Sequence, residues 1–396
     1  MTIQQALPLQ NIKVVELSHM VMGPATGVIL ADLGAEVIKV EPLKGDNTRR
    51  LKGSGAGYFP MYNRNKRSLC LDLKSEGGLQ VVKDLIAQAD VVIENFRPGA
   101  LQSMGLDYAT LSQSHPGLIY CSLKGFLSGP YEHRTALDEV AQMMGGLAYM
   151  TGLPDRPMRA GSSVIDITGA MFGVIGILAA LEERHHTGKG KEITSALYET
   201  TAFMVGQHMA QCAVTGEAPP PMSIRRSAWG VYDIFETADD DKVFVAVVSD
   251  TQWRLFCEAF DLQEFASDVS LAANSGRFEQ RDRIIPAISA VFSQLSKADL
   301  MAKLDTTGLP YAPINRPQDL FDDPQLNADG LLHVTLPDGA QVKLPALPIE
   351  MGGNKFGLRY NPPVEASETR STLHAAGFSD ADIDQLVADG VLRDEP

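Results

Sequence analysis

Cysteine is scarce in this 396-residue chain, which has only four, at positions 70, 121, 212 and 257. They are widely separated and form neither a Cys-x-x-Cys pair nor a Cys/His cluster with metal-ligand spacing, so no metal site is indicated. No histidine or helix start stands beside any of them in an activating position, which argues against a thiol nucleophile. We expect all four to be reduced core residues.

Positive charge is also in short supply, with 34 lysines and arginines against 49 aspartates and glutamates. The resulting net charge of −15 argues against a nucleic-acid partner, because proteins that bind phosphate backbones present basic surfaces. We expect partners among small molecules and proteins instead.

Membrane and secretion signals are missing as well. We find no apolar run of about 18 residues free of polar or charged interruption, and no basic-then-apolar leader at the N-terminus. No membrane partner is therefore indicated, and a cytoplasmic location is expected.

Dinucleotide-binding glycines are absent from the first strand–helix loop. Residues 12–17 form a β-rich apolar run, residues 24–34 have helical spacing that closes on a glycine, and residues 36–41 form a second strand. This βαβ opening predicts a parallel sheet with ligands beyond the carboxyl ends of its strands. Because residues 18–24 lack G-x-G-x-x-G, we expect a Rossmann-like α/β fold without a nicotinamide or flavin cofactor.

Polar and aromatic side chains follow two later strands of this sheet. The further predicted strands are residues 68–72, 90–94 and 118–123. A helix is predicted between the first two of them, at residues 76–89. Asn95 and Phe96 follow one strand end, and Lys124 and Phe126 follow the next. These side chains should share one edge of the sheet, where an aromatic face beside a cation suits a nucleobase linked to phosphates.

The charge balance inverts between residues 39 and 74, where nine bases stand against three acids. The bases are Lys39, Lys44, Arg49, Arg50, Lys52, Arg64, Lys66, Arg67 and Lys74. In an acidic protein this basic segment is a candidate phosphate site, because clustered Arg and Lys bind phosphates through charge-assisted hydrogen bonds. A solvated loop is the alternative, because runs of charge usually face water. Glycines at 53, 55 and 57 predict a flexible loop within it.

Asp166 is the one charged residue in the apolar segment 164–181. The segment has the Gly- and Ala-rich composition of a buried helix, and Asp is rarely buried without hydrogen bonds or a cation. Two interpretations stay open from these residues alone. Asp166 caps the helix, or it is a nucleophilic carboxylate at the helix N-terminus that forms covalent acyl intermediates.

The length and the 44% hydrophobic content predict two domains. Residues 216–221 read Gly-Glu-Ala-Pro-Pro-Pro and predict a linker, because consecutive prolines continue neither helix nor sheet. A hairpin at 232–248 followed by helices then predicts a smaller α+β domain. The expected division is 1–215 (large domain, first part), 216–228 (linker), 229–322 (small domain) and 323–396 (return segment and C-terminal part of the large domain).

A set of motifs spans nearly the whole chain: Gly-Pro-Ala25, Leu-Gly-Ala-Glu-Val-Ile-Lys-Val-Glu41, Asn65-Lys-Arg-Ser68, Glu94-Asn-Phe-Arg-Pro-Gly-Ala100, Lys124-Gly-Phe126, Asp166 and Gly-Leu-Pro-Tyr-Ala-Pro-Ile314. Together they resemble the family III CoA-transferases, the CaiB/BaiF group that includes formyl-CoA:oxalate and carnitine CoA-transferases. The resemblance implies a large Rossmann-like domain built from both chain ends, a smaller α+β domain, and a homodimer whose subunits interlock like rings.

The resemblance also implies a mechanism and a set of site residues. Asp166 would attack an acyl-CoA to give a mixed anhydride and then an aspartyl-CoA thioester, with no metal or redox cofactor. Coenzyme A, present as substrate rather than as a bound cofactor, would contact Val21, Met22, Leu71, Lys74, Asn95, Phe96, Arg97, Lys124 and Phe126.

The chain departs from the formyl-CoA transferase pattern in two places. Pro42 stands where that enzyme has an adenosine-contacting arginine, which weakens one CoA contact. The glycines of its active-site lid are missing at residues 227–231, which puts oxalate or formate specificity in doubt.

Two other functions are alternatives to CoA transfer. An acyl-CoA racemase of the same superfamily needs a histidine from a Gly-His-Asp run, whereas this chain reads Ala136-Leu-Asp138, and leucine cannot carry a proton. A non-catalytic acyl-CoA-binding protein is the alternative from a different class, and the presence of Asp166 argues against it.

Arg225 and Arg226 follow the proline linker and are the candidate residues for the acceptor acid. Adjacent residues of an extended segment point to opposite faces, so only one of them can face the acceptor. An arginine there would hold a second carboxylate in a bidentate grip, so we expect a small dicarboxylate as one partner and succinyl-CoA as donor. The alternative is that both arginines are solvated or contact the neighbouring subunit.

Overall fold

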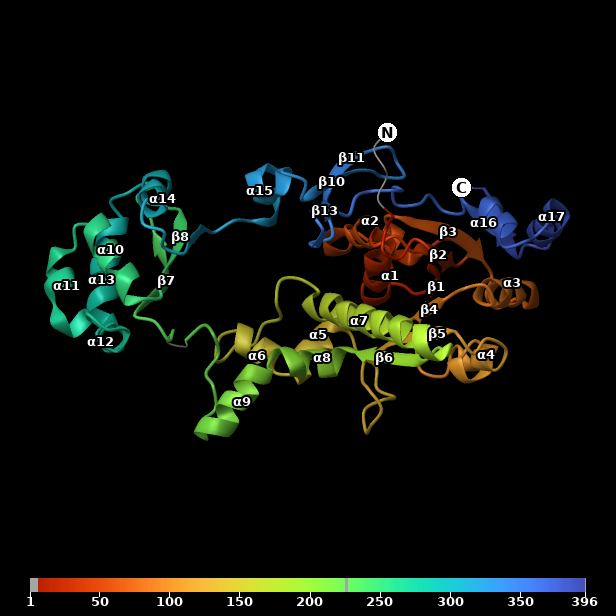
Figure 1. The fold of residues 1–396 in the computed structure, drawn as a ribbon, viewed down its shortest axis with the longest axis horizontal. Helices are drawn as coiled ribbons and strands as arrows, with labels where there is room; N and C mark the ends of the chain where they lie inside the picture. Colours follow the sequence, from red (N-terminus) through yellow and green to blue (C-terminus); the bar gives the residue numbers. More distant parts are fainter. Residues whose placement is uncertain (1–5, 225–226, 396) are drawn as a thin grey trace. The chain divides into compact units, whose positions relative to one another are not determined.

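The computed structural model describes residues 6–224 and 227–395, which form two units (Figure 1). Unit 1 comprises Met1–Ile224 and Pro324–Pro396, so both ends of the chain contribute to it, and unit 2 is Arg225–Asp323. Unit 1 therefore includes most of the segment 216–228 that the sequence predicts as a linker. Each unit has its own hydrophobic core.

A seven-stranded sheet organises unit 1, in the order β14-β3-β2-β1-β4-β5-β6. Its strands are β1 (Lys13–Leu17), β2 (Glu36–Glu41), β3 (Lys66–Leu71), β4 (Val91–Glu94), β5 (Ile119–Lys124), β6 (Glu192–Ala196) and β14 (Leu392–Arg393). All neighbours pair in parallel except β14, which is antiparallel to β3. The strand order reverses between β1 and β4, and ligands bind beyond the carboxyl ends of the strands at such a point.

Both faces of the sheet are buried. Val14 packs with α1 (Met22–Asp32) and α7 (Val164–Thr187), whereas its neighbour Val15 points to the other face. That second face is covered by α3 (Glu76–Ile86), α4 (Tyr108–Ser114), α16 (Thr369–Ala375) and α17 (Asp380–Ala388). Because both faces are covered, the strands have continuous rather than alternating apolar runs.

Shorter elements complete unit 1. The helices are η1 (Asn47–Arg50), η2 (Gly53–Gly55), α2 (Tyr58–Tyr62), η3 (Gln102–Met104), α5 (Asp138–Met144), α6 (Leu147–Thr151), α8 (Leu197–Met204), α9 (Gly206–Thr215) and α15 (Pro324–Asn327). Two antiparallel pairs are β10 (Leu331–Thr335) with β11 (Gln341–Pro345) and β12 (Glu350–Met351) with β13 (Asn354–Lys355). Three of the cysteines are buried, but Cys212 on α9 is partly exposed, which corrects the expectation of four core thiols.

Helix α7 has the length and composition of a membrane span, with a mean hydropathy of 2.2 in its richest window, although Asp166 interrupts it. Its inner face packs on α1, β5 and β6, and the core helix of a soluble protein meets the same criteria.

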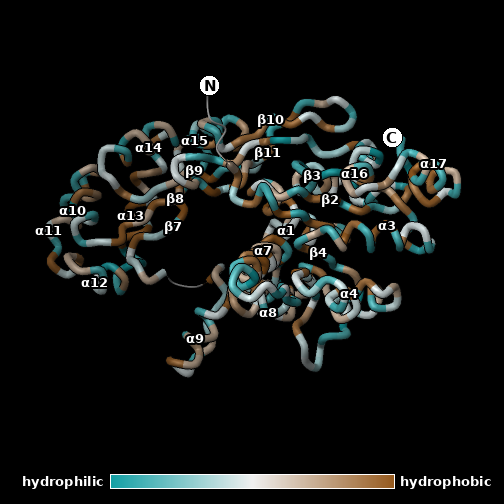
Figure 2. The backbone as a smooth tube through the Cα atoms, turned by 45° about the vertical axis from the view of Figure 1, so that its right-hand side comes forward, coloured by the Kyte–Doolittle hydropathy of each residue, from teal (hydrophilic) through white to brown (hydrophobic). Residues whose placement is uncertain are grey.

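Unit 2 is built on a three-stranded antiparallel sheet of β7 (Val231–Glu236), β8 (Lys242–Val247) and β9 (Tyr311–Pro313). Its helices are α10 (Asp250–Ala259), α11 (Gln263–Ser267), η4 (Val269–Leu271), α12 (Asn274–Glu279), α13 (Arg281–Phe292), α14 (Lys297–Asp305) and η5 (Pro317–Asp322). Hydrophobic residues line β8 and α13 (Figure 2), and aromatic side chains such as Phe235, Phe256 and Phe292 fill the core between sheet and helices.

Candidate active site

Asp166 lies in the first turn of α7, as the third residue of a helix that begins at Val164. Ser163, the residue before the helix, makes no capping hydrogen bond with its side chain. The Asp166 side chain is half-buried, and it makes no hydrogen bond or ion pair with any residue that the structure describes. The interpretation of Asp166 as the helix cap is therefore wrong, and its carboxyl group is free.

The cap comes from Asp138, at the start of α5. Its Oδ2 atom accepts hydrogen bonds from the backbone N–H of Ile165 at 2.9 Å and of Asp166 at 3.2 Å. In the sequence, Asp138 stands out only as the residue after Leu137, which occupies the position of the racemase histidine. No spacing rule could have found this contact, because it joins residues of two helices across a long loop.

Burial and two neighbouring charges determine the pKa of Asp166. Burial is the main cause that raises its pKa, to about 7, and the like charge of Asp138 raises it further. Arg159 opposes both. Burial raises the pKa of Tyr62 to about 12, and the charge of Asp166 adds to that rise. The pKa of the Asp166 carboxyl group thus lies near neutral pH, well above the usual range of aspartate.

The carboxyl ends of β1 and β4 are joined through one side chain. The Asn95 side chain accepts a hydrogen bond from the His19 N–H at 3.0 Å and donates one to the His19 carbonyl at 2.7 Å. The Phe96 ring meets the His19 ring edge-on at 6.2 Å between centroids. Asn95 and Phe96 therefore lie at the strand-order reversal together with His19, which sequence reasoning did not single out although it follows the first strand.

Lys124 and Phe126 lie at the adjacent strand end but are engaged within the protein. The Lys124 ammonium group is 2.6 Å from a Glu94 carboxylate oxygen and donates to the Phe96 carbonyl at 2.8 Å. The Phe126 ring is buried, where it contacts the rings of Tyr131 and Tyr198. Both residues follow the end of β5 as expected, but the Lys124 ammonium group and the Phe126 ring contact other groups of the protein.

The other residues expected to contact coenzyme A fall into two groups. Val21, Met22 and Leu71 are buried in the core, so only their backbone atoms are placed for a ligand at the strand ends. Lys74 and Arg97 are exposed, and neither has an ion-pair partner in the part of the chain that the structure describes. These two cations are free to bind phosphate.

The sequence was compared with protein families and with known proteins. A sequence model described as CoA-transferase family III matches residues 9–368. The chain belongs to this family. It is therefore an enzyme of the CoA-transferase class, whose substrates are CoA thioesters.

Curated relatives of this CoA-transferase align over most of their length. The succinate–glutarate CoA-transferase of Agrobacterium fabrum is 35% identical over 370 residues, covering 90% of this chain and 92% of the relative. The succinyl-CoA–D-citramalate CoA-transferase of Chloroflexus aurantiacus is 30% identical, covering 97% and 98%. Among solved structures, a CaiB/BaiF family protein from Brucella suis superimposes with a TM-score of 0.83 at 35% identity, covering 94% of this chain and 100% of that one.

The basic segment 39–74 of the transferase neutralises acids inside unit 1. Lys39 is 3.2 Å from Glu16 and 3.1 Å from Asp46, and Lys66 is 2.7 Å from the same Glu16. Both lysines are fully buried. Two pairs repeat this arrangement: Arg49 with Glu41 at 2.7 Å and Arg64 with Asp32 at 2.6 Å.

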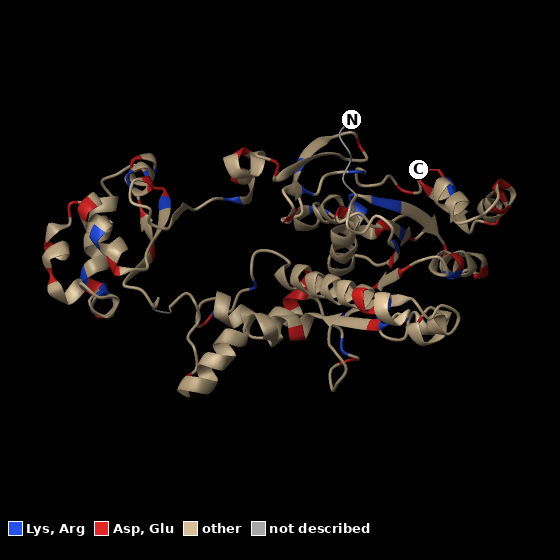
Figure 3. Ribbon diagram, in the orientation of Figure 1, with Lys and Arg blue, Asp and Glu red and all other residues tan. Residues whose placement is uncertain are grey.

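The prediction of a phosphate site formed by this whole segment is therefore wrong, because four of its nine bases are committed to buried carboxylates. Glu16 and Asp32, which take up three of those bases, lie outside the segment and were not counted with it. Figure 3 shows basic residues on β3, within the sheet. Arg50 and Arg67 make outer pairs with Glu365 and Glu36.

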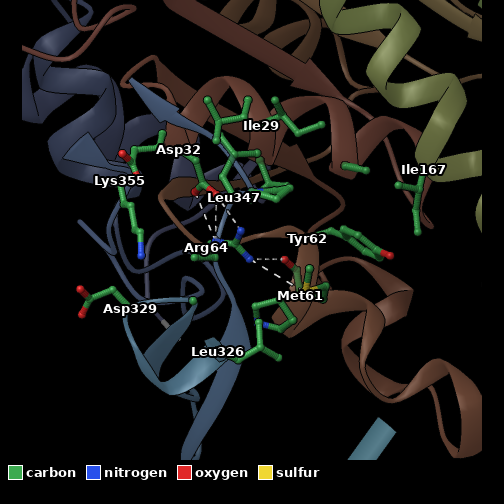
Figure 4. Close-up of a pocket in the computed structure, with 18 of the residues that line it drawn as sticks. Ile29, Asp32, Met61, Tyr62, Arg64, Ile167, Leu326, Asp329, Leu347 and Lys355 are labelled. Carbon is green, nitrogen blue, oxygen red and sulfur yellow. Dashed lines mark hydrogen bonds and ion pairs between the residues drawn. The ribbon is translucent and has the colours of Figure 1, made fainter. Parts of the chain in front are cut away.

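A cavity of about 530 Å³ lies beside the first turns of α7, entirely within unit 1. Ile167 and Met171 line it from α7, and Tyr62 lines it from α2. Most other lining residues are apolar, and the Arg64–Asp32 pair forms part of its wall (Figure 4). Asp166 precedes Ile167 but does not line this cavity.

Arg225 and Arg226 lie outside the described residues. In unit 2, Trp229 stacks on Tyr232 with ring centroids 5.4 Å apart, and Tyr232 meets Phe244 at 4.8 Å. Unit 2 thus has an aromatic cluster directly after the two arginines.

Proposed function

We propose that this enzyme transfers CoA from an acyl-CoA, with succinyl-CoA as donor, to a small dicarboxylate through an aspartyl-CoA thioester on Asp166. The observation that carries the proposal is the free, half-buried carboxyl group of Asp166 on the first turn of α7. A carboxylate whose pKa is raised to about 7 is more basic than an ordinary aspartate, and therefore a better nucleophile.

Each step exchanges one bond for another. An Asp166 oxygen attacks the thioester carbonyl, a C–O bond forms, the C–S bond breaks and the CoA thiolate leaves. The thiolate then attacks the Asp166 carboxyl carbon of the mixed anhydride, which forms the aspartyl thioester and releases the donor acid. The acceptor carboxylate repeats both steps in reverse, so no oxidant or reductant is consumed.

The ends of β1, β3, β4 and β5 are the proposed site for coenzyme A. Asn95 and Phe96 stand at the strand-order reversal, and the exposed Lys74 and Arg97 supply cations for its phosphates. Backbone atoms at Val21, Met22 and Leu71 complete the proposed site, and Lys124 with Phe126 supports it from within the fold.

We expect Lys74→Ala and Arg97→Ala each to weaken CoA binding about tenfold or more, because each removes a charge-assisted contact. Lys13→Ala is the matched control, because this exposed lysine begins β1 at the opposite end of the strand. Titration calorimetry with CoA measures the effect. Unchanged affinity in both variants would place the phosphates elsewhere.

The acceptor proposal is supported by the names of the relatives, which specify glutarate, D-citramalate and mesaconate, all dicarboxylates. We expect kcat/KM for succinate to exceed that for butyrate at least tenfold, because a second carboxylate gains a bidentate arginine contact. Arg225→Ala or Arg226→Ala should remove this preference. A preference for butyrate, or a succinate preference that survives both substitutions, would contradict the proposal.

A homodimer and a cytoplasmic location belong to the same proposal. The outer face of α7 exposes Met171, Ile175 and Leu178 by 43%, 59% and 38%, and α9 has no buried residue. Apolar side chains at this helical spacing mark an interface, and a second copy of the chain would cover them. Sedimentation analysis that found a monomer at micromolar concentration would contradict the dimer.

A further inference from the structure

The first turn of any α-helix has backbone N–H groups without a partner inside the helix. In α7 the Ile167 N–H reaches the Ser163 carbonyl at 3.0 Å, but Ile165 and Asp166 have no such acceptor within the helix. An aspartate in a first turn can satisfy such groups with its own side chain. Asp166 would then lose the free carboxylate that nucleophilic attack requires.

Asp138 removes this conflict, because it accepts both N–H groups from outside the helix. Its second oxygen, Oδ1, accepts from the Gln142 side chain at 2.6 Å and lies 3.4 Å from Arg159. Gln142 is fully buried and accepts in turn from the Ala160 N–H at 2.9 Å. This network ties α5, the loop before α7 and the first turn of α7 together, so the position of the Asp138 carboxylate is fixed.

We propose that Asp138 is a positioning residue, which caps α7 from the neighbouring helix so that the carboxyl group of Asp166 stays free and fixed for reaction. The inference rests on the proposed function, in which Asp166 is the nucleophile. Nothing in the sequence assigns this role, and the chemistry requires only that Asp138 keep its charge and its two acceptor contacts.

Asp138 has an electrostatic consequence as well. Its negative charge disfavours ionisation of Asp166 and so raises the pKa of that carboxyl group, while Arg159 lowers it. Another titratable group near Asp166 is the Tyr62 hydroxyl from α2. Acylation of Asp166 removes its charge and with it the repulsion from Asp138, so the carboxylate is destabilised relative to the acylated form.

The test compares Asp138→Asn, Asp138→Ala and the control Glu139→Gln. Asparagine keeps an acceptor oxygen but not the charge, and alanine removes both. Glu139 is a neighbouring exposed carboxylate that caps no helix, and its pair with Arg159 is long, at 3.9 Å, and solvent-exposed, so its removal should change little. The measurements are the pH dependence of adduct formation with succinyl-CoA, followed by intact mass, and the titration of Asp166 followed by carboxyl ¹³C NMR and assigned with Asp166→Asn.

We expect Asp138→Asn to move both midpoints below that of the wild type, because the like charge is gone. Asp138→Ala should also slow adduct formation about tenfold or more, because the first turn loses its external acceptor. Glu139→Gln should match the wild type. Midpoints and rates that do not differ between Asp138→Asn and Glu139→Gln would overturn the proposal.

Arg159→Gln should shift the pKa of Asp166 in the direction opposite to Asp138→Asn. It provides a second test if the Asp138 variants do not fold. It removes the charge that lowers the pKa of Asp166, so the midpoint should rise. A midpoint that falls or stays would overturn the proposal. Wild-type protein that forms no acyl adduct would refute the proposed function instead, and the NMR titration would still decide the role of Asp138.

Discussion

Asp166→Ala is expected to fold like the wild type and to lose CoA transfer by about three orders of magnitude or more, because no other described group replaces a covalent nucleophile. The structure supports normal folding, since the Asp166 side chain makes no hydrogen bond with residues 6–224 or 227–395 that the variant would lose. Alanine is preferred to asparagine for the rate measurement, because it cannot revert to aspartate by deamidation.

Initial rates with succinyl-CoA and succinate, together with intact mass after a hydroxylamine quench, check this result. Asp155→Asn is the matched control, because Asp155 is an exposed carboxylate in the loop before α7. Retention of more than about a tenth of the wild-type rate in Asp166→Ala would be incompatible with a covalent route through this residue.

Asp166→Asn gives a separate prediction about stability. A folded-state pKa raised from 3.8 to about 7 means that ionisation of Asp166 disfavours the fold, so the stability present below the ordinary pKa falls as the pH rises and is fully lost once the pH passes 7. Asparagine does not titrate, so the melting temperature of the wild type should fall relative to that of the variant between about pH 4 and 7 and stay level above that range. Parallel curves for the two proteins would show that Asp166 is not perturbed.

The sheet could be predicted because the burial of a strand is visible in a few consecutive residues. The central strands are buried on both faces, as Val14 and Val15 of β1 illustrate, so they appear as short apolar runs between turns. Asp166 could be singled out for a related reason, since a lone charge stands out in an apolar helix. Its partner Asp138 could not be found, because the capping contact depends on how α5 packs against α7.

The strand ends show a different limit of sequence reasoning. The positions of Lys124 and Phe126 at the end of β5 followed from the strand pattern, but the directions of their side chains did not. Phe126 turns into a cluster with Tyr131 and Tyr198, and Lys124 turns to Glu94 on the adjacent strand. Which cation stays free depends on the carboxylates that tertiary packing brings near it.

Glu16→Ala is expected to cause the largest loss of stability, about 3–5 kcal/mol, because it leaves two buried lysines without their shared partner. Glu16 lies on β1, 3.2 Å from the Lys39 ammonium group and 2.7 Å from that of Lys66. Lys39 would keep Asp46, but Lys66 would keep only the Pro24 carbonyl and the Asn63 side chain.

The packing around Glu16 leaves little room for another arrangement. A Cβ atom on Gly27 of α1 would lie 1.8 Å from a Glu16 carboxylate oxygen, so this glycine makes the space in which the acid sits. Burial lowers the pKa of Lys66 to about 8, although Glu16 opposes that effect. Without Glu16 the pKa of Lys66 would fall further, and the fold would have to bury either a neutral lysine or an unpaired charge.

Urea unfolding of the full-length protein measures the free energy of unfolding of each variant. Glu36→Gln is the control, because Glu36 makes a partly exposed pair with Arg67 at 3.6 Å. The double variant Glu16→Leu with Lys66→Met should recover part of the loss, because removing both charges costs less than leaving one unpaired. A Glu16→Ala protein as stable as Glu36→Gln would contradict the buried network. A double variant less stable than Glu16→Ala would show instead that Lys66 stabilises the fold through its contacts with Pro24 and Asn63.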